Sequence, residues 1–296
     1  MRRVIVITGP TGVGKTKLSI AIAKKYNGEI INGDAIQIYK GMDIGSSKVM
    51  EEEMEGVRHH LFSIKTVFED YTIYDYQRDC REKIDEILSR GHLPIIVGGT
   101  GLYIKSALYD YTLSDEEISN EMYEELSTEE VYKKLISLDK GIVIDPFNRK
   151  RIVRALNYYL STGRSIRENK DGNKLLYEAI FIGLTCEREV LYKRIDERVC
   201  EMLDKGLLEE VEGFYKDNIR TKPLLIGIGY KELYAYLDGE ISYDEAVNLI
   251  KRNSRRYAKR QYTFFNNQFD ITWFNVSFSN FLATISIVSE YLDKRL

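Results

Sequence analysis

A glycine-rich turn near the N-terminus carries a lysine and a threonine in the pattern GxxxxGKT. It follows the apolar run Val4–Ile7 and consists of Gly9, Pro10, Thr11, Gly12, Val13, Gly14, Lys15 and Thr16. Such a turn between a buried strand and a helix directs several backbone N–H groups at one anion, which the helix dipole also favours. In this pattern the lysine reaches the outer phosphates, and the hydroxyl of Thr16 faces a magnesium ion, Mg²⁺. We therefore expect a phosphate-binding loop, since an ordinary glycine turn explains neither Lys15 nor Thr16.

Two polar residues follow other predicted strands. Asp34 ends the strand-like stretch that begins at Glu29, and Thr100 follows the apolar run Pro94–Val97 through a pair of glycines. Parallel sheets bind ligands at the carboxyl ends of their strands, so both residues should lie beside the phosphate-binding loop. An aspartate there fits three roles: a general base, a magnesium ligand through water, or a helix N-cap. The glycines before Thr100 also fit a simple tight turn.

The order of the predicted elements indicates the fold class. Helical patterns separate four strand patterns, which lie at residues 4–8, 29–34, 94–97 and 179–184. With the phosphate-binding loop, this alternation predicts an α/β fold, a P-loop NTPase-like doubly wound parallel sheet. A chain of 296 residues allows one large domain with an insertion. We assign residues 1–112 and 169–296 to the core with its C-terminal helices, and residues 113–168 to a small helical insertion.

Two amphipathic helices are expected in the insertion. Ser127–Glu130 resembles a capping box and precedes three apolar residues on one helix face, Val131, Leu135 and Leu138. A second helix would run from Asn148 to Gly163 and bury Ile152, Leu156 and Leu160. Its outer face would carry the cations Lys150, Arg151 and Arg154.

A second cationic segment lies near the C-terminus. A helix predicted from Ser242 to Phe264 has one cationic stripe, formed by Arg252, Arg255, Arg256 and Lys259. Its opposite stripe would be buried and contains Tyr243, Ala246, Ile250, Tyr257 and Phe264. Residues 251–260 include six cations and no acid, although the net charge of the chain is −3. Neighbouring like charges on a helix repel, so the stripe indicates a polyanionic partner rather than a solvated face.

Composition argues against several other classes of protein. No apolar run approaches the roughly 20 residues that span a bilayer, and the N-terminus leads directly into a strand. We therefore expect a cytoplasmic protein that does not bind membranes. Three cysteines without a CxxC pattern and three scattered histidines argue against disulfides and a metal cluster. We expect the chain to be a monomer.

Several ordered stretches together resemble the bacterial tRNA dimethylallyltransferases, also called tRNA isopentenylpyrophosphate transferases, over nearly the whole length. The stretches are GPTGVGKT at Gly9, DAIQIYKGMDIGSSK at Asp34, HHLF at His59, PIIVGGTGLYI at Pro94, RIVRAL at Arg151, GYKELYAYLDGEISYDEA at Gly229 and KRQYTFF at Lys259. The family more often has Ala-Ser in place of Gly12-Val13, and its insertion is usually longer. Its eukaryotic relatives add a Cys/His finger at the C-terminus, which this chain lacks.

The resemblance implies an activity and a set of roles. The phosphate-binding loop would hold the diphosphate of dimethylallyl diphosphate, and the prenyl group would go to the adenosine immediately 3′ of the anticodon, on its exocyclic amine. Asp34 matches the general base of the family, whereas Thr100 and Arg198 match residues that contact the diphosphate. The segment that recognises the target base in the anticodon stem-loop of tRNA matches Asp34, Ala35, Ile36 and Gln37. Without the resemblance, Arg198 fits a solvated helix face.

The chemistry of prenyl transfer suits these residues. An allylic diphosphate ionises to a delocalised cation and an anionic leaving group, which Lys15, Arg198, loop amides, the Thr100 hydroxyl and Mg²⁺ would stabilise. The exocyclic amine of adenine is a weak nucleophile because its lone pair is delocalised, so it needs a proton acceptor such as Asp34. The target base must also leave the anticodon stack.

Two other functions remain open on the residues alone. In a P-loop kinase of a nucleoside or small metabolite, Asp34 would activate an acceptor hydroxyl, but the cationic C-terminal helix counts against that function. An NTP-dependent RNA-binding switch would need a residue that positions the hydrolytic water, and the sequence identifies none.

Overall fold

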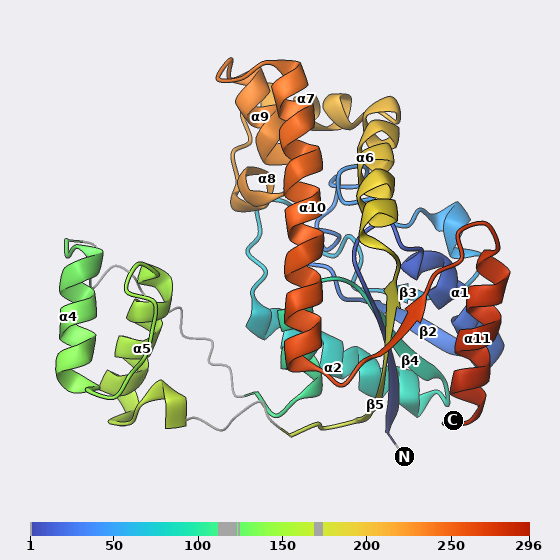
Figure 1. Ribbon diagram of the computed structural model, residues 1–296, viewed down its shortest axis with the longest axis horizontal. Helices are drawn as coiled ribbons and strands as arrows, with labels where there is room; N and C mark the ends of the chain where they lie inside the picture. Colours follow the sequence, from blue (N-terminus) through green and yellow to red (C-terminus); the bar gives the residue numbers. More distant parts are fainter. Residues whose placement is uncertain (1, 112–122, 124, 169–173) are drawn as a thin grey trace. The chain divides into compact units, whose positions relative to one another are not determined.

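The computed structural model describes residues 2–111, 123, 125–168 and 174–296, which form two compact units (Figure 1). The first unit contains Met1–Leu108 and Leu175–Leu296, and the second contains Tyr109–Lys174. The insertion predicted at residues 113–168 falls within the second unit, and its first boundary lies outside the described residues.

In the described residues of the first unit, six strands form one sheet in the order β3-β2-β4-β1-β5-β6. Their bounds are β1 (Arg3–Thr8), β2 (Gly28–Asn32), β3 (His59–His60), β4 (Leu93–Val97), β5 (Glu178–Thr185) and β6 (Thr272–Asn275). Every neighbouring pair is parallel. The predicted α/β parallel sheet is therefore confirmed, while β3 and β6, the short strands at its two edges, were not predicted.

Helices cover both faces of this sheet. Ile5 of β1 packs in one buried cluster with Ile22 of α1 and Val288 of α11. Val4 and Val6 alternate with Ile5 along the strand, point to the opposite face and are also fully buried. Buried residues on both faces are typical of a doubly wound parallel sheet. The helices of this unit are α1 (Lys15–Tyr26), α2 (Ile73–Ser89), α3 (Gly101–Leu108), α6 (Arg188–Asp204), α7 (Leu207–Lys216), α8 (Lys222–Ile226), α9 (Tyr230–Leu237), α10 (Tyr243–Gln268) and α11 (Phe281–Asp293).

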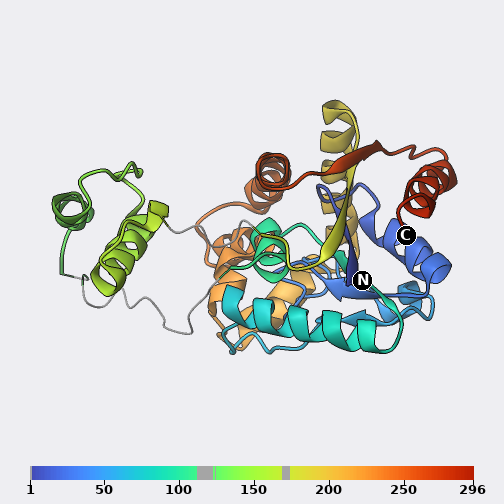
Figure 2. The same cartoon turned by 90° about the horizontal axis from the view of Figure 1, so that it is seen from below.

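The longest of these helices, α10, lies beside α6 (Figure 1). Figure 2 views α10 end-on and α2 from the side, so α10 runs across the direction of α2. Ser242 caps α10, because its Oγ accepts a hydrogen bond from the Glu245 N–H at 3.3 Å. The helix continues past its predicted end at Phe264 to Gln268, so it is long enough to carry several side chains toward the sheet.

A buried ionic cluster stabilises the start of β2, at the end of the strand opposite Asp34. The Glu29 side chain is 2% exposed and contacts Arg90, His60 and His92 at distances of 2.8, 2.6 and 2.6 Å. Burial alone would raise the pKa of Glu29, but the hydrogen bonds from these three residues outweigh it and lower the pKa to about 2. The carboxylate is saturated with partners, so this cluster is structural.

The second unit packs α4 (Thr128–Leu138) against α5 (Arg149–Thr162). Ser127 and Glu130 form the predicted capping box, with hydrogen bonds in both directions. The prediction that Leu138 and Leu160 are buried is wrong, since these side chains are 38% and 51% exposed. Both lie in the last turn of their helices, beyond the small core, which consists of Tyr123, Val131, Leu135, Ile142, Ile152, Val153, Ala155 and Leu156.

Candidate active site

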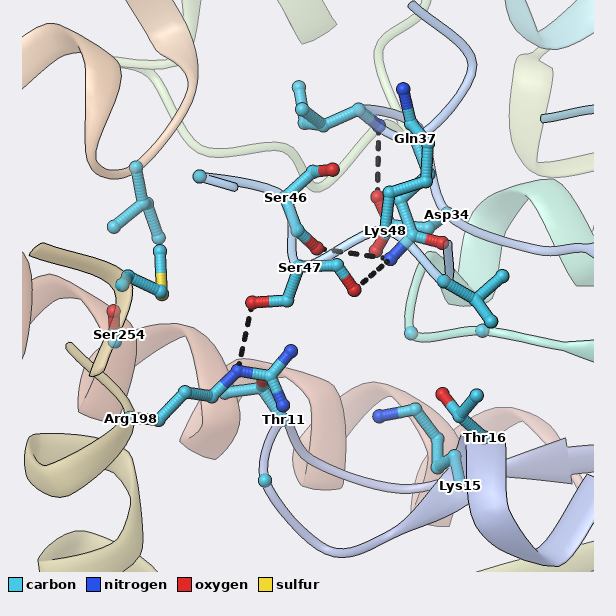
Figure 3. Close-up of a pocket in the computed structure, with 18 of the residues that line it drawn as sticks. Thr11, Lys15, Thr16, Asp34, Gln37, Ser46, Ser47, Lys48, Arg198 and Ser254 are labelled. Atoms are coloured by element: carbon cyan, nitrogen blue, oxygen red, sulfur yellow. Dashed lines mark hydrogen bonds between the residues drawn. The ribbon is translucent and has the colours of Figure 1, made fainter. Parts of the chain in front are cut away.

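A cavity of about 1240 Å³ lies where the phosphate-binding loop, the carboxyl ends of β2 and β4, and helices α6 and α10 meet (Figure 3). The predicted site residues that line it are Thr11, Gly12, Gly14, Lys15, Thr16, Asp34, Ala35, Ile36, Gln37, Thr100 and Arg198. Gly9, Pro10 and Val13 belong to the same loop but are not among the lining residues. The predicted convergence of the loop with Asp34 and Thr100 is thus present in the structure.

The loop has a backbone that favours glycine at two positions. Gly9 has a φ of 140°, and a Cβ atom there would lie 2.5 Å from the Leu184 carbonyl oxygen. Gly14 has a φ of 91° and immediately precedes α1. The loop therefore turns sharply between β1 and α1, which leaves the first N–H groups of the helix available to an anion. Thr16 is exposed on the first turn of α1 and lines the cavity.

Two cations in the cavity are held by neutral groups. The Lys15 Nζ donates to the carbonyl oxygens of Gly9 and Pro10 at 2.9 and 2.8 Å. The Arg198 Nε donates to the Ser47 Oγ at 3.1 Å (Figure 3). Burial, followed by the nearby charge of Arg198, lowers the pKa of Lys15 to about 7. Burial also lowers the pKa of Arg198. An anion bound between these cations would compensate both effects.

A third cation was not predicted. Arg194 lies one helical turn before Arg198 on α6 and also lines the cavity. Its Nε donates to the Gly12 carbonyl oxygen at 3.0 Å, and its guanidinium lies 4.0 Å from the centre of the Phe278 ring. Arg194 therefore supports the phosphate-binding loop from the α6 side. Its spacing of four residues from Arg198 was the signal available in the sequence.

Asp34 and Thr100 are joined through the backbone. The Asp34 Oδ1 accepts a hydrogen bond from the Ile36 N–H at 2.9 Å, which makes a local turn rather than a helix N-cap. The Thr100 Oγ1 accepts from the Ala35 N–H at 3.1 Å, and the Thr100 N–H donates to the Gly33 carbonyl at 3.0 Å. The segment after β4 therefore fixes the segment that carries Asp34. Of the roles left open, general base and magnesium ligand remain.

The turn formed by residues 43–47 connects two predicted site residues. The Gln37 Nε2 donates to the Ser46 carbonyl oxygen at 3.0 Å, while Ser47 accepts from Arg198. Glu210 on α7 holds this turn, because its carboxylate accepts from the N–H groups of three successive residues, Asp43, Ile44 and Gly45, at 3.0, 2.7 and 3.1 Å. The position of Gln37 is thereby coupled to that of Arg198. The sequence analysis did not identify Glu210.

Helix α10 contributes two further residues to the cavity. Tyr257 and Gln261 both line it, and the phenol of Tyr257 is hydrogen-bonded to Thr100 and Gln261. Burial, with a smaller effect from the charge of Asp34, raises the pKa of Tyr257 to about 12. The sequence analysis placed Tyr257 on the buried stripe of the helix and gave Gln261 no role. In the structure this stripe faces the cavity.

The cationic residues predicted to bind a polyanion lie in both units. Lys150, Arg151 and Arg154 lie on α5 of the second unit. Arg252, Arg256 and Lys259 are exposed on α10. Arg255 departs from the predicted free stripe, because it is half-buried and pairs with Asp196 on α6. The exposed cationic surface of α10 therefore comprises Arg252, Arg256 and Lys259.

The donor set for a metal ion is sparse. Among the residues the structure describes, no group of three or more His, Cys, Asp or Glu side chains is arranged to hold a metal. The same part of the chain contains no helix that is both long and apolar enough to span a membrane. Magnesium commonly binds through one or two protein oxygens together with substrate phosphates and water. The exposed Thr16 hydroxyl and the Asp34 carboxylate on the cavity wall fit that type of site.

Comparisons with known proteins support a single family. The sequence model of the family described as "IPP transferase" matches residues 37–268. The chain is 48% identical to the tRNA dimethylallyltransferase of Geobacillus kaustophilus over 306 aligned residues, covering 99% of this chain and 97% of the relative.

Two solved structures agree with the sequence comparisons. A tRNA delta(2)-isopentenylpyrophosphate transferase from Staphylococcus epidermidis is 40% identical, with a TM-score of 0.75 and 99% of both chains covered. A eukaryotic dimethylallyltransferase described as acting on tRNA is 29% identical, with a TM-score of 0.87, over 99% of this chain and 80% of that one. Since the family match spans most of the sequence and a relative 48% identical covers nearly all of it, the chain belongs to the IPP transferase family.

Proposed function

We propose that the protein transfers the dimethylallyl group of dimethylallyl diphosphate to the exocyclic amine of the adenosine immediately 3′ of the anticodon in tRNA, and releases diphosphate. One observation carries the proposal: a single cavity holds the phosphate-binding loop, two cations and the carboxylate of Asp34. A diphosphate leaving group and an amine nucleophile need these two kinds of group side by side. Membership of the IPP transferase family favours this reaction over the kinase alternative.

The cationic side of the cavity would stabilise the leaving group. As the carbon–oxygen bond of the allylic diphosphate breaks, negative charge grows on the departing oxygens. Lys15 and Arg198 are already oriented by neutral acceptors, so they can turn to the anion without breaking an ion pair. The loop N–H groups and the Thr100 hydroxyl would donate to the same oxygens. Magnesium, held by Thr16 and the diphosphate, would neutralise part of this charge.

The carboxylate side of the cavity would activate the nucleophile. The lone pair of the exocyclic amine is delocalised into the adenine ring, so attack on the allylic carbon requires that the amine lose a proton. Asp34 is the proposed acceptor of that proton. Its Oδ1 is oriented by the Ile36 N–H, and the segment around it by Thr100. A carboxylate fixed in this manner needs little reorganisation when the reaction begins.

The surrounding residues would bind the anticodon stem-loop. The target base has to leave the stack to reach Asp34, and the segment Ala35–Gln37 would recognise it. The exposed cations of α10 and the α5 cations Lys150, Arg151 and Arg154 would contact RNA phosphates. We further propose that the protein acts as a monomer in the cytoplasm, where unmodified tRNA is available.

Labelled substrates test the proposed function. The protein is incubated with unmodified tRNA and either prenyl-labelled dimethylallyl diphosphate or γ-labelled ATP, and the tRNA nucleosides are then analysed. Label in a prenylated adenosine, dependent on both tRNA and prenyl donor, supports the transferase. Transfer of phosphate from ATP to a nucleoside or metabolite, without prenylation of tRNA, would refute it in favour of a kinase.

A further inference from the structure

Gln261 is a buried polar residue of α10 that the mechanism above does not use. Its side chain lines the cavity, and the residue is 5% exposed. The Nε2 donates to the Gly99 carbonyl oxygen at 3.1 Å. The Oε1 is also buried, and no group in the described part of the chain donates a hydrogen bond to it. Buried polar atoms in native proteins nearly always have a partner, so an orphaned acceptor on a cavity wall indicates a ligand.

The surroundings fix which end of this amide is left free. The Gly99 carbonyl can only accept a hydrogen bond, so it must face the Nε2 and not the Oε1. The contact is close, because a Cβ atom at Gly99 would lie 1.9 Å from the Nε2. The phenol of Tyr257 is hydrogen-bonded to Gln261 from within the same helix. The free Oε1 is therefore a property of the folded protein.

The orphaned oxygen belongs to the part of the cavity that contains Asp34. Tyr257 joins Gln261 to Thr100, and the charge of Asp34 acts on Tyr257. The Thr100 hydroxyl in turn accepts from the Ala35 N–H, next to Asp34 in the chain. A donor group that reaches Asp34 thus has a second acceptor close by.

We propose that the Gln261 Oε1 accepts a hydrogen bond from the exocyclic amine of the target adenine and makes Gln261 a specificity-determining residue. This inference rests on the proposed function. The amine has two N–H groups. As its nitrogen bonds to the allylic carbon and the carbon–oxygen bond to diphosphate breaks, one proton passes to the Asp34 carboxylate. The other N–H remains in the product, and Gln261 holds that one.

This arrangement selects an amine against a carbonyl oxygen. Inosine differs from adenosine by carrying an oxygen at the position of the exocyclic amine. That oxygen cannot donate, so it would face the lone pairs of Gln261 Oε1 and of Asp34. Sites that hydrogen-bond one group of a substrate reject analogues that leave their polar atoms unpaired. We therefore expect Gln261 to contribute to the preference for adenosine.

Binding of two matched RNAs tests this role. Anticodon stem-loops with adenosine or inosine at the target position are titrated into the protein in the presence of magnesium and inorganic diphosphate. Gln261→Met, which has a similar shape but no hydrogen-bonding group, should reduce the adenosine-to-inosine affinity ratio by about tenfold. Gln261→Glu keeps an acceptor oxygen and should retain most of the preference. Asn266→Met changes an exposed amide on the same helix and should leave the ratio unchanged.

The outcomes separate this inference from the proposed function. Equal weakening of both RNAs by Gln261→Met, with the ratio unchanged, would show that the residue only supports the fold. If Gln261→Met does not fold, Gln261→Glu decides alone, since loss of its adenosine preference would overturn the role of the acceptor. Prenylation of tRNA by the wild type with no preference for adenosine in binding would overturn the inference but leave the proposed function intact. Absence of prenylation would overturn both.

Discussion

Lys15 provides a quantitative test of how the cavity binds its anion. In the free protein, burial and the nearby charge of Arg198 lower the pKa of Lys15 from 10.5 to about 7. A bound diphosphate would place negative charge beside the Nζ and raise this pKa again. Binding should therefore be accompanied by proton uptake above neutral pH. Because the bound state has the higher pKa, affinity is greatest at low pH and decreases as the pH rises through that of the free protein.

The size of the effect follows from the two pKa values. Between about pH 7 and the ordinary lysine value of 10.5, each pH unit should weaken diphosphate binding by roughly tenfold through Lys15 alone. At about pH 8, roughly 0.9 of a proton should be taken up by Lys15 for each diphosphate bound. A lysine with an ordinary pKa would take up almost none.

Isothermal titration calorimetry measures this proton uptake. Inorganic diphosphate is titrated in buffers of different ionisation enthalpy, and the slope of the apparent enthalpy gives the number of protons exchanged. Diphosphate itself titrates in this pH range, so Lys15→Arg is the matched control, since arginine stays charged. The difference between wild type and Lys15→Arg isolates Lys15. Equal proton uptake by the two proteins at about pH 8 would refute the assignment of a low pKa to Lys15.

Three other substitutions test separate parts of the molecule. Asp34→Ala should lower turnover by at least about 100-fold with little change in tRNA affinity, and unchanged turnover would exclude Asp34 as the general base. Changing the exposed Arg252, Arg256 and Lys259 to Ala should weaken tRNA binding and flatten its salt dependence by roughly 0.7 to 0.9 per lost phosphate contact, whereas an unaltered salt slope would indicate a solvated face. In wild type, about 3 kcal/mol of unfolding free energy should be lost as the pH falls from 4.5 toward 2, because the pKa of Glu29 is lowered to about 2; chemical denaturation of Glu29→Gln should not show this decrease.

The sequence predicted the elements that short-range patterns specify. The loop of residues 9–16 and the strands that precede Asp34 and Thr100 could be identified, because glycine spacing and apolar runs report local backbone structure. The parallel sheet then followed from the order of the elements, and it brings these residues to one edge. The edge strands β3 and β6 escaped prediction because a run of two or four residues carries too little periodicity.

The residues that escaped prediction act through long-range contacts. Glu210 is one of several acids on α7, and only the fold shows that three successive N–H groups of residues 43–45 donate to it. Arg255 belongs to a cationic run in the sequence, yet it pairs with Asp196, which lies far away in the chain. The helical period of α10 correctly separates a polar stripe from an apolar one, but it cannot show that part of the apolar stripe faces a cavity. This is why Gln261 had no predicted role.

The two ends of the sheet differ in how completely their polar groups are satisfied. At the start of β2, Glu29 has three charged or ionisable partners and no need of a ligand. At the carboxyl ends, Lys15 and Arg198 are held by neutral acceptors and Gln261 keeps an unpaired oxygen. Leaving these groups unsatisfied costs folding stability, which a site built only for structure would not incur. Because the donors face the phosphate-binding loop and the free acceptor lies near Asp34, the pattern of unsatisfied groups matches a ligand that is anionic at one end and donates hydrogen bonds at the other.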